Sequence, residues 1–462
     1  MRLLIKNALI ATASEVFPGA VLSERGKISL VLRNPDASSL LEASEGAFAI
    51  DAFGMHLLPG GVDPHTHFDL DVGFAKASDD FYTGSIAAAC GGTTTFIDHM
   101  AFGPKGCDAF HQYIKYREIS KDSVIDYGLH GVLQDKSQAS LESMRVLKER
   151  EGVSSFKIYL TYDFKLDEAS ALEVLKKAKQ LDITVCVHCE DDGLLADARK
   201  KLLQSGRKSP IWHASSRPAQ AEANAIKRIL ELALQADEAK VYIVHLSSEM
   251  GLNEISNACE AGRKNIFVET CPQYLFLDES SIQTEEQALK LTMSPPPRKP
   301  SDRKALWEGL RNGIIHTIGT DHCPFFYKTQ KIRGKDDFTA CPNGLPGVEL
   351  RMTLMYSEGY IKRKLPLTRV VELCCAQPAR IFGLGSRKGD ISPGLDADFV
   401  LFDPSAKYKV TAANLHENVD YTPYEGMEVE GAPVMVISGG KIIVNSNEFL
   451  GRKGSGRYLM RS

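Results

Sequence analysis

Three consecutive stretches of the sequence decide the fold: SSFKIYL at residues 154–160, ASALEVLKKAKQ at 169–180 and ITVCVHCE at 183–190. The first and third stretches are short, largely apolar and rich in β-branched and aromatic residues, as buried strands are. The middle stretch spaces its apolar residues three and four apart, which predicts an amphipathic helix. A strand, a helix and another strand in this order predict a βαβ unit of a parallel sheet.

The same alternation continues on both sides of this unit. Helical patterns at 219–235 and 301–312 separate further strand-like runs. Eight parallel strands within about 330 residues predict an α/β fold, a TIM-like (β/α)8 barrel with insertions, which we assign to residues 53–387. The predicted strands are 57–62, 93–98, 125–131, 154–160, 183–190, 240–246, 266–271 and 314–319.

The two ends of the chain share a different character, with short β-branched runs and glycine-containing turns. The run at 2–12 alternates apolar and polar residues and contains Lys6, so we predict a strand there rather than a signal peptide. Residues 1–52 and 388–447 are predicted to pair into one small composite β-sandwich domain. The basic C-terminal arm at 448–462 is expected to be solvated or to pack on a neighbouring subunit.

The composition argues against several classes of function. The formal net charge is -4, which gives no basic surface for nucleic acid. No apolar run approaches the roughly 20 residues that span a bilayer, so we expect no membrane contact. The ten cysteines follow no regular framework, so we expect reduced thiols in a cytoplasmic enzyme. Cys186 and Cys189 lie inside a predicted strand, and we interpret them as packing residues rather than as a redox or zinc-binding pair.

Histidines and an aspartate fall at the ends of several predicted strands. His65 and His67 are two residues apart on an extended segment, so their side chains point to the same side. His188, His245 and Asp321 lie at the ends of the fifth, sixth and eighth predicted strands. Because the carboxyl ends of barrel strands form one rim, we expect these five residues to converge on a metal site.

Lys157 is unusual because it lies between large apolar residues in a predicted central strand. A buried, unpaired ammonium group is costly, and one about 4 Å from a divalent cation is repelled by roughly 8 kcal/mol at an effective dielectric of 20. Reaction with carbon dioxide would convert the amine into an anionic carbamate that can bridge two metals. The residues alone leave open a second interpretation, in which Lys157 extends to the rim as an ordinary lysine.

The remaining histidines are expected to have supporting roles. His99 and His322 lie near the proposed rim, where either could contact the ligand-bearing side chains. Five others lie in turns, in polar stretches or at a strand end without a partner motif, and we expect them to be structural or solvated. They are His56, His111, His130, His213 and His416.

Ten local motifs are spread over nearly the whole chain: PGGVDPHTHF at 59–68, DFYTG at 80–84, GGTTT at 91–95, SFK at 155–157, HCE at 188–190, HLS at 245–247, ETCPQY at 269–274, GTDHC at 319–323, PNGLPGVE at 342–349 and KGDI at 388–391. Taken together they resemble the amidohydrolase superfamily and, within it, the hydantoinase–dihydropyrimidinase group. This group provides the expectations that follow.

The resemblance implies a centre of two divalent metals, zinc by preference, with manganese or cobalt as alternatives. It implies that carbon dioxide converts Lys157 into N6-carboxylysine, which bridges the metals. His65, His67 and Asp321 would bind one ion, while His188 and His245 would bind the other. Relatives of this kind are commonly homotetramers.

The same resemblance implies roles for residues around the metals. Tyr162 matches a tyrosine that hydrogen-bonds the scissile carbonyl. Ser294 and Asn343 match positions that hold the cyclic amide, largely through backbone atoms. Asp321 can accept a proton from the attacking water and pass it to the leaving nitrogen, as base and then acid.

The expected substrates are small cyclic amides, 5,6-dihydropyrimidines or 5-substituted hydantoins, opened to N-carbamoyl amino acids. Dihydroorotases in this superfamily carry an arginine just after the paired histidines, where this chain has Phe68 and Asp69, so an acidic ring substituent is disfavoured. Apolar side chains after the first and fourth strands either form a wall for the 5-substituent or pack under the rim: Phe68, Leu70, Val72, Phe74, Tyr159, Tyr162 and Phe164. An allantoinase-type ureide hydrolase and a non-catalytic scaffold are the alternatives.

Overall fold

The computed structural model describes residues 2–462 and contains two β-sheets. Eight strands form a parallel sheet in which every strand pairs with its neighbour in sequence order. The N–H of Asp321 donates to the carbonyl of His65 over 2.9 Å, so the chain after the last strand closes against the first. The predicted (β/α)8 barrel is therefore confirmed. Its strands are β6 (Gly61–Thr66), β7 (Thr93–His99), β8 (Asp126–Val132), β9 (Ser155–Tyr159), β10 (Thr184–His188), β11 (Val241–Ile243), β12 (Ile266–Thr270) and β13 (Thr317–Ile318).

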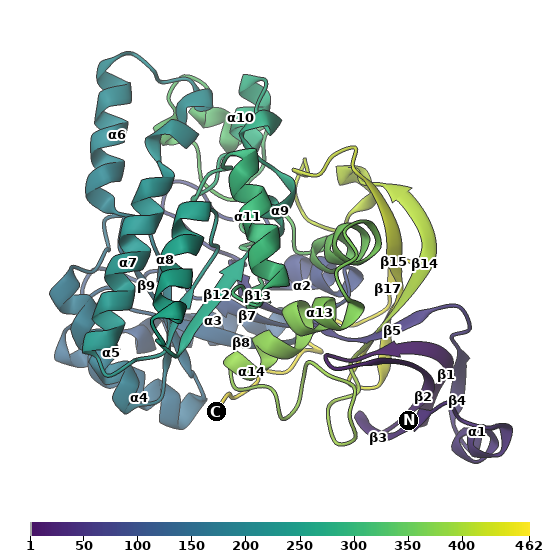
Figure 1. Ribbon diagram of the computed structural model, residues 1–462. Helices are drawn as coiled ribbons and strands as arrows, with labels where there is room; N and C mark the ends of the chain where they lie inside the picture. The colour runs from purple at the N-terminus through teal and green to yellow at the C-terminus, as the bar shows by residue number, and fades with distance from the viewer. Residues whose placement is uncertain (1) are drawn as a thin grey trace.

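Helices surround this barrel (Figure 1). In α5 (Glu168–Gln180), Asp167 caps the first turn by accepting from Ser170 N, and an apolar face that includes Val174 and Leu175 is buried. One helix, α1 (Ala37–Ser44), lies away from the barrel, beside the second sheet. The other helices are α2 (Phe81–Cys90), α3 (Ala109–Ile119), α4 (Gln138–Glu151), α6 (Asp192–Gln204), α7 (Ala219–Gln235), α8 (Glu249–Glu260), α9 (Pro272–Phe276), α10 (Glu285–Lys290), α11 (Pro300–Arg311), α12 (Arg351–Leu354), α13 (Leu367–Val371) and α14 (Gln377–Ile381).

The second sheet contains nine strands and joins the two ends of the chain. In Figure 1 the purple N-terminal strands and the yellow C-terminal strands lie side by side. The contact between them is antiparallel, with Leu58 opposite Val400. The strands are β1 (Arg2–Ala11), β2 (Val16–Glu24), β3 (Lys27–Arg33), β4 (Phe48–Asp51), β5 (His56–Pro59), β14 (Phe399–Lys409), β15 (Glu428–Ser438), β16 (Lys441–Asn445) and β17 (Glu448–Phe449).

The run predicted as the first barrel strand, 57–62, is divided between the two sheets. Its first half belongs to β5 in the nine-stranded sheet, and β6 begins at Gly61. Gly60 makes the crossing possible, because a Cβ at this position would lie 2.1 Å from Thr94 Oγ1. The prediction was therefore wrong about the strand's bounds, although His65 still lies on the first barrel strand.

The C-terminal arm packs on the barrel of its own chain. Leu459 is 1% exposed and its N–H donates to Tyr127 O over 2.7 Å. Arg461 is also buried and donates to Ser155 Oγ over 2.8 Å. Figure 1 shows the end of the chain beside α4. The expectation of a solvated arm, or of one that packs on a neighbouring subunit, is wrong for these residues.

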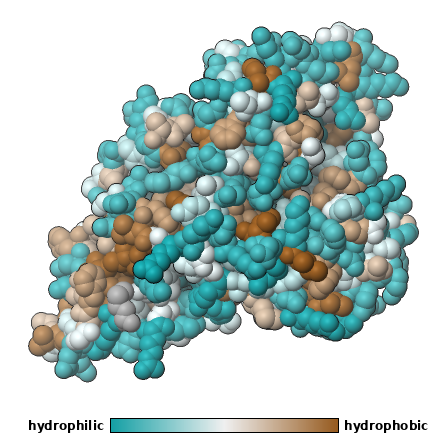
Figure 2. Space-filling view, turned by 180° about the vertical axis from the view of Figure 1, so that it is seen from behind, coloured by the Kyte–Doolittle hydropathy of each residue, from teal (hydrophilic) through white to brown (hydrophobic). Residues whose placement is uncertain are grey.

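The face of the molecule opposite to the view of Figure 1 is largely polar. Figure 2 shows one face, on which hydrophilic residues cover most of the area and hydrophobic residues gather in small patches. No helix within residues 2–462 is both long and apolar enough to cross a membrane.

Candidate metal centre and active site

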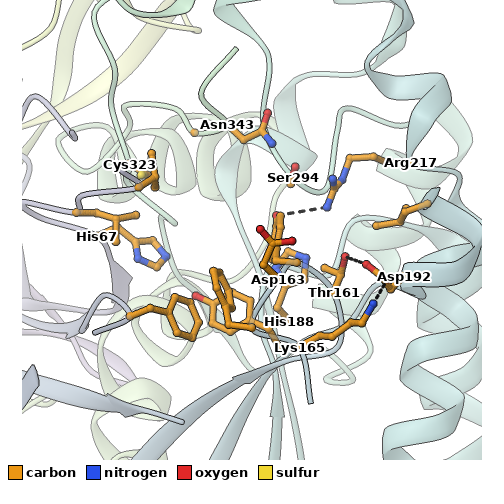
Figure 3. Close-up of a pocket in the computed structure, with 18 of the residues that line it drawn as sticks. His67, Thr161, Asp163, Lys165, His188, Asp192, Arg217, Ser294, Cys323 and Asn343 are labelled. Atoms are coloured by element: carbon orange, nitrogen blue, oxygen red, sulfur yellow. Dashed lines mark hydrogen bonds and ion pairs between the residues drawn. The ribbon is translucent and has the colours of Figure 1, made fainter. Parts of the chain in front are cut away.

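A cavity of about 920 Å³ opens at the carboxyl ends of the barrel strands (Figure 3). Of the nine site residues predicted from the sequence, only His65 is absent from its lining. His65 is fully buried and contacts two residues of the lining. The other eight line the cavity together: His67, Lys157, Tyr162, His188, His245, Ser294, Asp321 and Asn343.

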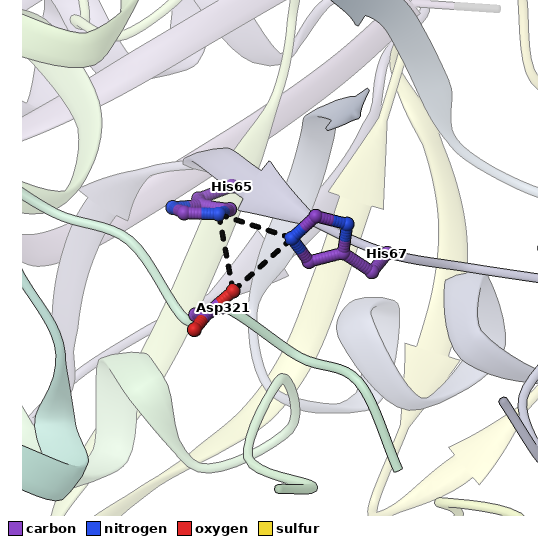
Figure 4. Close-up of side chains that lie close together, drawn as sticks. All are labelled: His65, His67 and Asp321. Carbon is purple, nitrogen blue, oxygen red and sulfur yellow. Dashed lines mark hydrogen bonds and ion pairs between the residues drawn. The ribbon is translucent and has the colours of Figure 1, made fainter. Parts of the chain in front are cut away.

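His65, His67 and Asp321 point toward one another (Figure 4). Asp321 Oδ1 lies 3.1 Å from His65 Nε2 and 3.2 Å from His67 Nε2, and the two imidazole nitrogens are 3.2 Å apart. The two histidines come from the end of β6 and the segment just after it, while Asp321 comes from the segment after β13. Because the barrel closes between its first and last strands, the three side chains meet although Asp321 is far from the two histidines in the sequence.

Buried glutamates fix the orientation of the histidine rings. Glu269 on β12 accepts from His65 Nδ1 over 2.6 Å and from the N–H of His245 over 2.9 Å. With its Nδ1–H engaged, His65 presents the lone pair of Nε2 to the trio. Glu190 lies 2.7 Å from His188 Nε2, which directs His188 Nδ1 toward the cavity.

His188 and His245 form a second pair next to the trio. His188 Nδ1 lies 2.9 Å from His245 Nε2, and the rings of His65 and His245 have centroids 5.6 Å apart. Arg217 forms an ion pair with Glu190, and Glu190 in turn bonds the His188 nitrogen that faces away from His245. Four histidines and one aspartate thus form two adjacent clusters of metal-binding atoms.

Lys157 on β9 lines the same cavity as residues of both clusters. The lysine is 1% exposed, and no carboxylate in residues 2–462 lies within 4.0 Å of its amine. Burial lowers the pKa of its amine. A positive charge on Lys157 also opposes protonation of all four histidines.

The donor set fits divalent metal ions. Zinc ligands lie 2.0–2.2 Å from the ion, so two ligands of a tetrahedral site are about 3.3 Å apart. The distances within the trio match this spacing. Burial opposes protonation of His65, but Glu269 and Asp321 outweigh it and raise the pKa of His65 to about 9. Burial lowers the pKa of His67 to about 4, so this ring stays neutral and keeps a lone pair for a metal ion.

A family model described as the amidohydrolase family matches residues 56–443. The chain belongs to the amidohydrolase family. A D-phenylhydantoinase from Escherichia coli O1:K1 is 44% identical to this chain over 462 residues, and the match covers 100% of this chain and 98% of that protein.

Solved structures match this amidohydrolase over its whole length. The dihydropyrimidinase from Brevibacillus agri NCHU1002 has a TM-score of 0.95 at 38% identity, covering 100% of this chain and 99% of that chain. A D-hydantoinase has a TM-score of 0.96 at 37% identity, with the same coverage of both chains. The L-hydantoinase from Arthrobacter aurescens is more distant, at 27% identity and a TM-score of 0.89, and the match covers 99% of each chain.

Three site residues of this amidohydrolase have left-handed backbone conformations. The φ angles are 71° at Tyr162, 41° at His245 and 52° at Asp321. Such conformations are unfavourable for residues other than glycine, and they persist where the surrounding structure fixes them. The fold thus holds these side chains at the cavity against a local backbone preference.

Polar groups without protein partners line the side of the cavity away from His67 (Figure 3). Ser294 Oγ and Asn343 Oδ1 are buried, and no hydrogen-bond partner exists for either within residues 2–462. The hydroxyl of Tyr162 lies 3.3 Å from Arg217 NH2. Buried polar atoms without partners are costly, so these groups indicate where a polar ligand binds.

The supporting histidines of the amidohydrolase are more buried than the sequence suggested. His99 stacks on His130 with ring centroids 4.2 Å apart and contacts the ring of His65 at 4.4 Å. His322 bonds Asp79 over 3.0 Å, and its carbonyl accepts from the N–H of His67. His130 and His213 were expected to be structural or solvated, and both are buried. His213 also lines the cavity.

Apolar side chains line another part of the cavity. Leu70, Val72, Phe74, Tyr159 and Phe164 all contribute to it, together with Tyr162. Phe68 is fully buried and packs edge-on against Phe81 and Phe96 instead. Six of the seven side chains considered for a wall thus line the cavity, whereas Phe68 is a packing residue beneath the rim.

Sequence reasoning assigned no role to Glu190, Glu269 or Arg217. The two glutamates occur in the motifs that support the family resemblance, and each interrupts or ends an apolar strand-like run, a signal that could have identified them. Arg217 lies in a polar stretch with no comparable signal. Cys186 and Cys189 are buried and form no disulfide bond, in keeping with packing roles.

Proposed function

We propose that this protein is a metal-dependent hydrolase that opens 5,6-dihydropyrimidines and 5-substituted hydantoins to N-carbamoyl amino acids. The observation that carries the proposal is the convergence of His65, His67, His188, His245, Asp321 and Lys157 on one cavity at the barrel rim. The names of the related D-phenylhydantoinase and dihydropyrimidinase support this substrate class.

His65, His67 and Asp321 would hold one divalent cation, and His188 and His245 a second. Zinc suits these nitrogen and oxygen donors, and manganese or cobalt are alternatives. When bound, such ions polarise a carbonyl group and lower the pKa of water from 15.7 to about 7. An amide is a weak electrophile, so both effects bear on its hydrolysis near neutral pH.

Lys157 would contribute to this centre as N6-carboxylysine. Its neutral amine nitrogen forms a bond to the carbon of carbon dioxide and releases one proton, which leaves a carbamate with one negative charge. The burial of Lys157 without a carboxylate partner, in the cavity that residues of both clusters line, supports this assignment. The carbamate would replace a repulsive cation with a two-oxygen ligand.

The protein's own residues would orient the ring and move the proton. Ser294 and Asn343 supply buried polar groups for the ring amide. Tyr162 would donate its hydroxyl proton in a hydrogen bond to the carbonyl oxygen as negative charge develops there. Asp321 would accept a proton from water and deliver it to the leaving nitrogen.

Two further proposals concern the assembly of the protein and its compartment. We expect a homotetramer because proteins of the family that this chain resembles commonly form one. The ten unbonded cysteines support a reducing compartment, and we propose the cytoplasm.

The substituent at ring position 5 would lie against the apolar wall. We expect the enzyme to open both dihydrouracil and 5-phenylhydantoin. Phe164→Ala should lower kcat/KM for the phenyl substrate by about tenfold or more while changing that for dihydrouracil little, because only the larger substrate uses the wall. Steady-state kinetics with both substrates measures this. No hydrolysis of 5-phenylhydantoin by the wild type would contradict the assignment of the wall.

A further inference from the structure

Two loops carry the residues proposed to hold the ring: the first loop contains Ser294 and the second contains Asn343. A single buried lysine connects the two loops. Lys331 is fully buried, and its Nζ donates to Thr292 O over 2.8 Å and to Pro342 O over 3.3 Å. Thr292 precedes Ser294 by two residues, and Pro342 directly precedes Asn343. One amine therefore bonds the backbone of both loops beside their ring-binding residues.

The first loop is fixed at every position around Ser294. His213 Nε2 lies 2.8 Å from Met293 O, and the Tyr274 hydroxyl donates to Pro295 O over 2.8 Å. Together with the bond from Lys331, these contacts engage the carbonyls at 292, 293 and 295. Ser294 Oγ stays without a partner in the described chain. The surroundings thus hold the backbone and leave Ser294 available to a ligand.

The second loop depends on the same carbonyl. The N–H of Gly344 donates to Thr292 O over 3.1 Å, so Thr292 O accepts from Lys331 and from the second loop together. Asn343 Oδ1, between the two anchored residues, also has no partner in residues 2–462. The spacing between Ser294 and Asn343 is therefore set by contacts that meet at Thr292 O and at the Lys331 amine.

Burial of Lys331 is not explained by packing alone. No carboxylate of the described chain lies within 4.0 Å of its amine, and burial lowers the pKa of that amine to about 8. A methionine would fill the same space without the cost of burying a polar group. The bonds to the two loops are what the amine adds.

We propose that Lys331 is a positioning residue that sets the spacing of the two ring-binding loops and so determines how tightly a cyclic amide is held. The inference rests on the proposed function, because it assigns Ser294 and Asn343 to the substrate ring. Lys331 does not touch the ring in this proposal and acts only through the loop backbones.

Lys331→Gln is the first test. Glutamine keeps N–H donors, but its side chain is one bond shorter and can reach only one of the two carbonyls. We expect KM for dihydrouracil and for hydantoin to rise by about threefold to tenfold, with metal content unchanged. A KM within twofold of wild type for both substrates would overturn the proposal.

Lys331→Met is the second test, since methionine has the reach of glutamine but no donor. KM should rise further than in Lys331→Gln. The ratio of kcat/KM for the six-membered and five-membered rings should also change by about threefold, because the spacing between the two ring-binding loops is no longer fixed. If Lys331 only supports folding, kcat falls equally for both rings while KM and the ratio stay constant, which would contradict the proposal. Should Lys331→Met not fold, the Lys331→Gln result decides.

Lys335→Met serves as the matched control, because Lys335 is an exposed lysine of the same segment. Its kinetics should equal those of wild type. Failure of the proposed function looks different, since wild-type protein with bound metal would then open neither ring. With active wild type, the comparison of the Lys331 variants tests the positioning role alone.

Discussion

At the scale of single residues, buried glutamates set the chemistry of the site. Glu269 engages His65 Nδ1, and Glu190 engages His188 Nε2, so each ring presents its other nitrogen to the centre. The clustering of the candidate ligands could be predicted from the sequence, because histidine and aspartate at strand ends carry a recognisable signal. The groups that orient them could not, because glutamate or arginine in a polar motif has many ordinary roles.

Tyr162 provides a prediction at this scale. Replacing it with phenylalanine removes the hydroxyl that would face the developing negative charge but leaves the ring that lines the cavity. We expect kcat to fall by about 10²–10³-fold, the usual effect of removing one such donor, with the metal content of wild type. Kinetics and metal analysis of the same preparation measure both. A kcat within twofold of wild type would assign the stabilisation to another group.

At the scale of elements, local pattern predicted strands and helices well, and pairing partners less well. The helix expected at 219–235 is α7 with the same bounds. By contrast, the run at 57–62 contributes residues to two sheets, because a single residue, Gly60, separates β5 in one sheet from β6 in the other. The contacts of the C-terminal arm could not be predicted from local sequence pattern either, because they involve residues more than 300 positions away, such as Tyr127.

The arm yields a prediction with a control next to it. Leu459 is 1% exposed and Met460 is 58% exposed. Leu459→Ala should lower the free energy of unfolding by about 2–5 kcal/mol, as for other buried leucines, and Met460→Ala by no more than about 0.5 kcal/mol. Denaturant titration of both variants tests this. Equal effects would show that the arm does not pack on the barrel as described.

At the scale of the whole molecule, the two sheets meet through a buried charge network. Lys388 Nζ lies 2.7 Å from Asp126 Oδ2 on β8 and 2.5 Å from Asp398 Oδ2 beside β14. The barrel brings the candidate ligands from strands far apart in sequence to one rim, which is why the fold and the clustering of these side chains could be predicted together. The positions of Arg217 and Lys331 could not, because each acts through contacts that only the folded chain creates.

The measurement that tests the central claim most directly is the metal content of wild type and Lys157→Ala, together with their hydrolysis of dihydrouracil. We predict two divalent ions per wild-type chain. In Lys157→Ala we predict loss of metal and of activity, with partial recovery of activity when a short-chain carboxylic acid is added, because the acid can occupy the place of the carbamate. Wild-type protein without metal, and a Lys157→Ala variant that opens dihydrouracil as fast as wild type, would contradict the account.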